Sequence, residues 1–182
     1  MRNSLPFALA FCLLIPCLAA SAQSGTLSKT RNETVLDGSI QDGEYSFTKS
    51  FNGDKLKLYL NWSDRALSVA VTAETRGWVG AGLNSLRMNG ANILVGYVRG
   101  RDQAFRIDDG RGHAHSLGDQ GVELGHALTE QGRWTTMEVQ LQPDAFIQAG
   151  QSSLQVIVAY GNADGFKPIH RFRTADTVQL ER

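Results

Sequence analysis

The segment Lys55-Leu56-Lys57-Leu58-Tyr59-Leu60-Asn61-Trp62 alternates apolar and polar residues in steps of two. Its leucines and Trp62 fall on one face, which is the pattern of a half-buried β-strand. After a polar turn at 61–65, Leu67-Ser68-Val69-Ala70-Val71-Thr72-Ala73 repeats the alternation. The two segments together predict a β-hairpin with one face turned towards a core.

Short strand patterns continue along the chain, separated by clusters of Gly, Asp and Asn that favour turns. We expect a helical turn only at 143–149. Many short strands with almost no helical periodicity predict an all-β domain, an immunoglobulin-like antiparallel β-sandwich of two packed sheets, with no internal repeat or second domain. The further expected strands are 44–51, 78–83, 93–98, 104–107, 122–128, 134–141, 154–160 and 177–180.

The N-terminus has the pattern of a secretory signal peptide over residues 1–22: Arg2, an apolar run over 5–19, then Ala20-Ser21-Ala22. We expect cleavage after Ala22 and a periplasmic or secreted protein. The apolar run is shorter than the roughly 20 residues that span a bilayer, and no later segment is longer or more apolar, so no transmembrane segment is expected after cleavage. Residues 23–33 are rich in Ser, Thr, Gly and charge and predict a flexible N-terminal segment, which leaves 34–182 as the domain.

Composition narrows the class of protein further. Lys and Arg number 18, as do Asp and Glu, so no charge excess indicates nucleic acid or an anionic membrane as a partner. Cys12 and Cys17 both lie in the expected leader. The mature domain would then have no disulfide, no thiolate zinc site and no covalent C-x-x-C-H haem attachment. Any cofactor must be held by other ligands.

Met88 lies in Arg87-Met88-Asn89-Gly90, a polar break between the apolar runs 78–83 and 93–98. A thioether is a soft donor that binds iron or copper, and on haem iron a Met/His pair raises the reduction potential. Methionines also fill irregular gaps, so a packing role is the alternative. Met137 shows that pattern, because it alternates with Val139 and Leu141, and we expect it in the core.

Three motifs and a late histidine carry a family resemblance. They are Asp-Gly-Ser-Ile-Gln-Asp-Gly-Glu-Tyr at 37–45, Gly-Trp-Val-Gly-Ala-Gly-Leu at 77–83, Met-Asn-Gly-Ala-Asn-Ile-Leu-Val-Gly-Tyr at 88–97, and His170. In this order they resemble the DOMON domain, over most of the mature chain. Its haem b-binding members are similar to the cytochrome domain of cellobiose dehydrogenase, in which a Met and a His ligate the iron from opposite sides. The resemblance implies haem b, with Met88 and His170 as axial ligands.

The other histidines compete for the second axial position. His126 alternates with Val122, Leu124 and Leu128 and predicts a satisfied histidine on an apolar face. His113 and His115 flank one alanine in a Gly-rich loop. On extended backbone they would point the same way and could bind copper or zinc, although solvated loop histidines are commoner.

His170 has cationic neighbours at Lys167, Arg171 and Arg173, which would offset the charge of haem propionates. Its alternative is a solvated basic edge strand. The aromatic side chains at 78, 97 and 166 would either wall a haem pocket or join the core. The glycines at 77, 80, 82, 90 and 96 would let backbone approach a macrocycle or close tight turns.

Nothing in the sequence indicates an enzyme: there is no G-x-S-x-G, no nucleophilic cysteine and no carboxylate pair, and Asp108-Asp109 is interpreted as a turn. We therefore expect an exported b-type cytochrome domain that carries single electrons to or from a separate redox protein. Two alternatives stay open. One is a haem-free DOMON or carbohydrate-binding-module-like domain that binds sugars, since DOMON members without haem are thought to bind sugars or act as interaction modules. The other is a copper or zinc carrier that uses His113 and His115.

Overall fold

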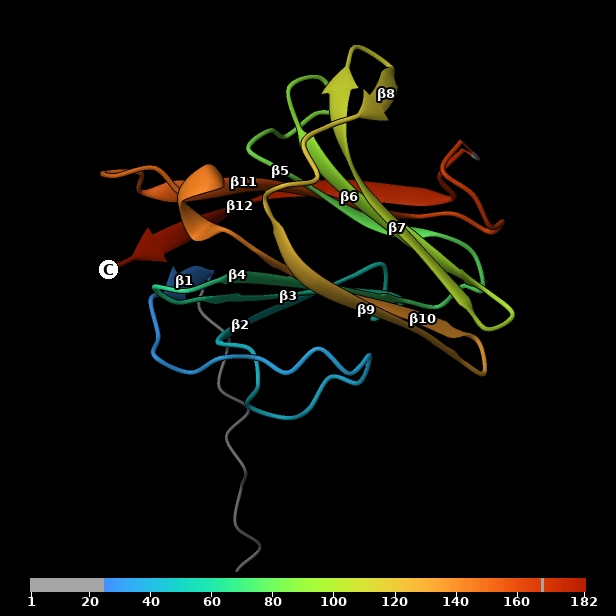
Figure 1. Cartoon of the computed structure of the whole chain (residues 1–182), viewed down its shortest axis with the longest axis horizontal. Coiled ribbons are helices and arrows are strands. Elements are labelled where there is room, and N and C mark those ends of the chain that lie inside the picture. The colour runs from blue at the N-terminus through green and yellow to red at the C-terminus, as the bar shows by residue number, and fades with distance from the viewer. Residues whose placement is uncertain (1–24, 168) are drawn as a thin grey trace, which may run out of the picture.

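The computed structural model describes residues 25–167 and 169–182, which form a sandwich of two packed sheets (Figure 1). The described residues include one short 3-10 helix, Pro143–Ala145. The seven-stranded sheet has the order β1 (Thr26–Ser28), β12 (Phe172–Glu181), β11 (Ser153–Tyr160), β5 (Val79–Leu83), β6 (Asn92–Arg99), β7 (Asp102–Arg111) and β8 (Ala114–Leu117). The five-stranded sheet has the order β2 (Phe47–Phe51), β3 (Leu56–Trp62), β4 (Leu67–Ala73), β10 (Trp134–Leu141) and β9 (Glu123–Gln131).

The predicted hairpin is confirmed as β3 and β4. They pair antiparallel, with Leu58 opposite Val71 and Leu60 opposite Val69, so both sets of apolar side chains lie on the same face. Leu56, Leu58 and Leu60 are fully buried. Cross-strand contact between such pairs stabilises the sheet, and their burial explains why the alternation was readable in the sequence.

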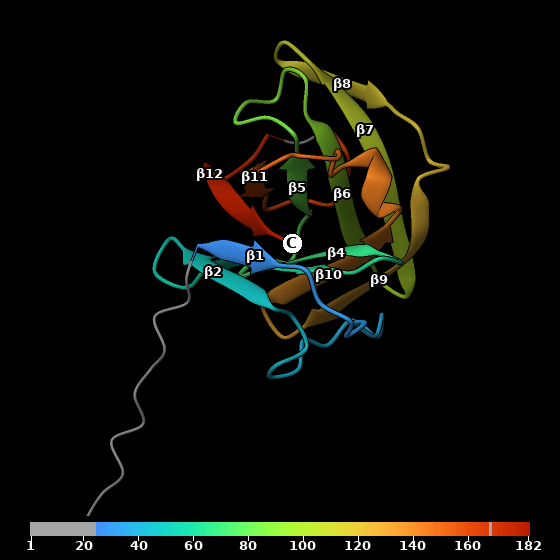
Figure 2. The same ribbon diagram turned by 90° about the vertical axis from the view of Figure 1, so that its left-hand side faces the viewer.

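The core lies between the inner faces of the two sheets (Figure 2). From the seven-stranded sheet it receives every second residue of β5, namely Val79, Ala81 and Leu83, together with Leu94 of β6. Met137 of β10 is fully buried, as predicted. The predicted all-β sandwich is thus confirmed.

One polar cluster centres on Glu138 of the five-stranded sheet. Glu138 on β10 is buried, and its carboxylate accepts hydrogen bonds from the Tyr45 hydroxyl at 2.8 Å and from the Gly38 backbone N–H at 2.6 Å. Desolvation raises the pKa of Glu138 and that of the Tyr45 phenol. The 37–45 motif therefore packs against β10 through its backbone and one tyrosine.

Three expectations need correction. Residues 26–28 lie in the segment predicted as flexible, yet they form β1, which pairs parallel to β12 and buries Leu27 completely. The burial of one leucine and the added strand order this part of the 23–33 segment, and the sandwich begins there rather than at 34. Strand β2 begins at Phe47 instead of 44, and Asp108-Asp109 is not a turn but part of β7. The expected signal peptide, 1–22, lies outside the described residues.

In the described ranges, no helix has the length and apolar character needed to cross a membrane.

Candidate functional site

A pocket lies on the outer face of the seven-stranded sheet, the face turned away from the core. Its floor follows from strand register. Gly80 on β5 is opposite Val95 on β6 and Ala159 on β11, and Gly82 is opposite Ile93 and Ile157. Residues directly opposite one another share a face, so these side chains form one apolar patch. Because the residues at its centre are glycine and alanine, the floor of the pocket lies close to the strand backbone.

Met88 is held over one end of this floor by the loop between β5 and β6. The Gly90 N–H donates to the Gly110 carbonyl at 2.9 Å, and the Gly110 N–H donates to the Ala91 carbonyl at 2.9 Å. A Cβ at position 110 would lie 1.7 Å from the Met88 carbonyl oxygen, so only glycine permits this approach. Gly90 closes the turn with a positive φ of 80°. The loop therefore presents Met88 to the pocket from a fixed backbone.

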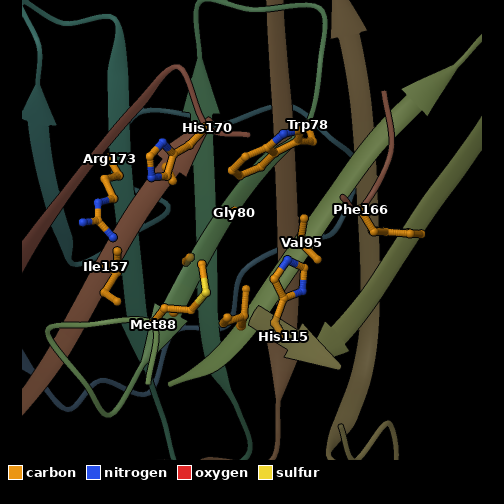
Figure 3. Close-up of a pocket in the computed structure, with 13 residues that line it drawn as sticks. Trp78, Gly80, Met88, Val95, His115, Ile157, Phe166, His170 and Arg173 are labelled. Atoms are coloured by element: carbon orange, nitrogen blue, oxygen red, sulfur yellow. The ribbon is translucent and has the colours of Figure 1, made fainter. Parts of the chain in front are cut away.

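His170 lies at the opposite end of β5. The next residue, Arg171, donates its N–H to the Tyr160 carbonyl at 2.8 Å, and Tyr160 pairs with Val79, the first residue of β5. Met88 instead follows Leu83, the last residue of that strand. At about 3.4 Å per residue, the strand separates its two ends by roughly 13 Å. Both side chains line the pocket between them (Figure 3).

Trp78 walls the pocket near His170 (Figure 3). A Cβ at Gly161 would lie 2.1 Å from the indole Nε1, so the indole packs directly on the glycine backbone. The Gly161 N–H donates to the Trp78 carbonyl at 2.9 Å. The buried Nε1 has no hydrogen-bond partner among the described residues. This donor is therefore covered by the Gly161 backbone rather than turned to the cavity.

The wall on the β7–β8 side contains a histidine that the sequence did not assign to this site. His115 on β8 lines the pocket, and its Nδ1 is hydrogen-bonded to the carboxylate of Asp108 on β7. Asp108 is fully buried and also accepts a hydrogen bond from Arg106 at 2.7 Å. The guanidinium of Arg106 lies 4.2 Å from the ring centroid of Phe166, another wall residue. This cluster was not predicted, because the sequence Asp108-Asp109-Gly110 is typical of a turn.

Only one of the three predicted cations reaches the pocket. Arg173 lines it, while Lys167 is exposed and Arg171 contacts the side-chain oxygen of Asn162 at 3.4 Å. Arg173 pairs with Ala159 in the β11–β12 register and so lies on the same face as the floor. A guanidinium at the edge of an apolar pocket suits an anionic group on a mainly apolar ligand.

The remaining predicted residues are placed as follows. Tyr97 lies behind Phe166, with ring centroids 5.0 Å apart. His126 is a satisfied histidine, as predicted: its ring packs against Phe105 with centroids 4.7 Å apart, and it is hydrogen-bonded to Glu123 at 2.5 Å. It lies outside the pocket. His113 is exposed and does not line the pocket, so it does not share a site with His115. Within the described ranges, no three His, Cys, Asp or Glu residues group as a metal site.

The side chains that line the pocket include the donor types that hold haem b. The cavity is shallow, about 80 Å³ and open to solvent, and its lining is mainly apolar. It offers one thioether, two imidazoles and one guanidinium. Thioether and imidazole are the ligands of low-spin haem iron, whereas a sugar site needs convergent polar groups that this floor lacks.

Comparison with known proteins identifies the fold. No protein-family model and no curated protein matches the sequence. Among solved structures, the chain is similar to the cytochrome domain of the cellobiose dehydrogenase of Myriococcum thermophilum, with a TM-score of 0.52 and 11% identity over 74% of this chain and 82% of that one. This likeness shows the fold, and it confirms the resemblance to that cytochrome domain.

Two other structures are similar at a TM-score of 0.49. One is the cytochrome b domain of pyranose dehydrogenase from Coprinopsis cinerea, 13% identical over 71% of this chain and 79% of that chain. The other is a family 9 carbohydrate-binding module from Caldicellulosiruptor kristjanssonii in complex with cellotriose, 14% identical over 86% of this chain and 92% of that chain.

Proposed function

We propose that this protein binds one haem b non-covalently through Met88 and His170 and carries single electrons. The observation that carries the proposal is that Met88 and His170, 82 positions apart in the sequence, both line one apolar pocket from opposite ends of β5. The fold shared with a cytochrome domain supports it.

The residues of the pocket have distinct parts in this proposal. Met88 and His170 would hold the group from its two sides, and Gly80, Gly82 and Ala159, which have small side chains or none, would form the floor between them. Arg173 would compensate the charge of a propionate. When bound, the haem supplies a one-electron couple, and thioether ligation raises its potential.

Two strong axial ligands would leave no iron position for a substrate, so the chain's task would be electron transfer rather than catalysis. The partner would be a separate redox protein. The proposed location is periplasmic or secreted, on the strength of the leader in the sequence.

The decisive experiment is reconstitution of the purified chain with haem b, followed by optical spectra of both oxidation states. We expect sharp bands of low-spin reduced haem, and a sulfur-to-iron charge-transfer band in the oxidised protein. His170→Ala should abolish the low-spin spectrum, whereas His126→Ala, which changes an exposed histidine, should leave it intact.

Failure to bind haem would overturn the proposal. If the haem-free chain instead bound cellotriose by calorimetry, the carbohydrate-binding alternative would replace it. If it bound copper or zinc in a manner lost in His115→Ala, the metal-carrier alternative would replace it.

A further inference from the structure

We propose that His115 is a second axial ligand held in reserve on the Met88 side of the pocket, able to replace Met88 at the iron. The inference deepens the proposed function and depends on it. It starts from the cluster formed by His115, Asp108 and Arg106, which neither the axial pair nor the sandwich core explains.

Asp108 lies on the outer face of the sheet, because it is opposite Ile93 of the pocket floor. It is nevertheless fully buried. Burial of a carboxylate is costly unless the charge is paired and hydrogen-bonded; here Arg106 and His115 both contact Oδ2, while Oδ1 has no partner among the described residues. His115 is therefore held by a buried carboxylate, which distinguishes it from a solvated loop histidine.

The hydrogen bond determines which nitrogen of His115 is free. A carboxylate only accepts, so Nδ1 of His115 carries the proton towards Asp108. The lone pair then lies on Nε2, which has no hydrogen-bond partner within the described part of the chain. A histidine that donates one ring N–H to a carboxylate has the arrangement of a metal ligand.

His170 lacks a comparable partner. It lines the pocket too, and within 25–167 and 169–182 its ring has no carboxylate partner. Among the described residues, the pocket imidazole with a carboxylate partner is that of His115. This asymmetry is the reason to assign His115 a part at the iron.

His115 and Met88 belong to the same end of the pocket. His115 is opposite Gly110 in the β7–β8 register, and the Met88 carbonyl lies against that same glycine. His170 lies at the other end of β5, and Figure 3 shows Met88 and His115 together, apart from His170. His115 could consequently replace Met88 without displacing His170.

The exchange would have a measurable consequence for redox chemistry. Thioether ligation raises the reduction potential of haem iron, so ligation by His115 would lower it. The protein would have two ligand states of different potential, and the choice between them would depend on how firmly the 84–91 loop holds Met88.

The experiment uses the haem-loaded full chain, with optical and electron paramagnetic resonance spectra. In Met88→Ala we expect the sulfur band to disappear while the iron stays low-spin with two nitrogen ligands. The double variant Met88→Ala/His115→Ala should be high-spin. The matched control Met88→Ala/His113→Ala, which removes the exposed neighbouring histidine instead, should stay low-spin.

A second measurement needs no change at Met88. Mild urea should remove the sulfur band of the unaltered protein before the low-spin signal is lost, whereas in His115→Ala both should be lost together. Asp108→Asn should lower the low-spin to high-spin ratio of Met88→Ala by about 10- to 100-fold, the usual effect of removing such a partner.

High-spin iron in Met88→Ala, or a low-spin state that persists in the double variant, would overturn the role of His115. Either result would leave the Met88–His170 proposal standing if the unaltered protein shows its sulfur band. A chain that binds no haem would remove both proposals at once.

Discussion

The two faces of the seven-stranded sheet differ in what they carry, although the same strands build both. On β5 the inward residues Val79, Ala81 and Leu83 are buried in the core, while the outward residues are Gly80 and Gly82. The inner face is filled by side chains of the opposite sheet. The outer face is apolar and has small residues at its centre. The walls of the pocket on this face come from loops and from β8. The packed core thus lies on one face and the proposed haem site on the other.

The largest expected effect comes from raising the outer floor. Ala159→Phe places an aromatic ring where the haem would lie, so haem retention after gel filtration should be lost. Urea unfolding of the haem-free protein should change little, because the side chain points away from the core. Ala175→Phe is the control, since Ala175 is an exposed residue opposite Ile157 and does not line the pocket. Equal haem loss in both variants would contradict the position of the site.

Adjacent residues of β6 provide the second comparison. Leu94 is fully buried on the inner face, and Leu94→Ala should lower the free energy of unfolding by about 2–5 kcal/mol through lost burial and a cavity. Ile93 faces the pocket and is only half-buried, so Ile93→Ala should cost clearly less while weakening haem binding. Urea denaturation and haem titration of the two variants measure both effects. A larger stability loss in Ile93→Ala would break the distinction between the faces.

The loop that carries Met88 offers a third change, through Gly110. In Gly110→Ala the new Cβ would lie 1.7 Å from the Met88 carbonyl oxygen, so the loop or β7 must shift. We expect destabilisation of about 1–3 kcal/mol, the usual cost of overpacking, with a weaker sulfur band in the haem-loaded protein. Gly25→Ala is a matched control because a Cβ there meets nothing within 4 Å. An unaltered sulfur band would show that this contact does not hold Met88.

The smallest effect concerns the five-stranded sheet and its dependence on pH. Burial raises the pKa of Glu138 above its ordinary value of about 4.3, so the folded state takes up this proton more readily than the unfolded state. The contribution of Glu138 to stability should therefore decline as pH rises from that value to its folded-state pKa, and then stay constant.

Subtracting the unfolding free energy of Glu138→Gln from that of the unaltered protein at each pH isolates this contribution. A difference that grows with rising pH would mean that the pKa of Glu138 is lowered instead. The haem spectrum should be unaffected in this variant, since Glu138 lies on β10, outside the pocket lining.

Most of the strands could be predicted from the sequence because their signal is local. The alternation at 56–62 reflects burial of one face of a single strand. This pattern does not depend on which other strands pair with it, so it can be recognised in the sequence. The prediction failed where the signal is not local. Leu27 alone is too little to indicate a strand, and β1 forms only because the edge of β12 is there to pair with it.

Met88 was found from its unusual position in a polar break, and His170 from the family resemblance. Their ligand roles stay predictions, but their convergence on one pocket is a result of the structure. The sequence indicated His115 only as a copper or zinc ligand together with His113, and it did not indicate Asp108. Asp-Asp-Gly is typical of a turn, and only the register that puts Asp108 opposite Ile93 and Gly110 opposite His115 brings a buried carboxylate and a half-buried imidazole together beside Met88.

By itself, the sequence determined the all-β class and most strand positions, because alternation in steps of two follows from the pleat of each strand. It also determined which side chains have the chemistry to bind iron. The tertiary structure alone decided which of these residues meet, because residues 88, 115 and 170 reach one pocket only through the pairing of β5 with β6 and β11, and of β7 with β8. Strand pairing joins positions far apart in the chain, and their separation leaves no pattern in the sequence that connects them.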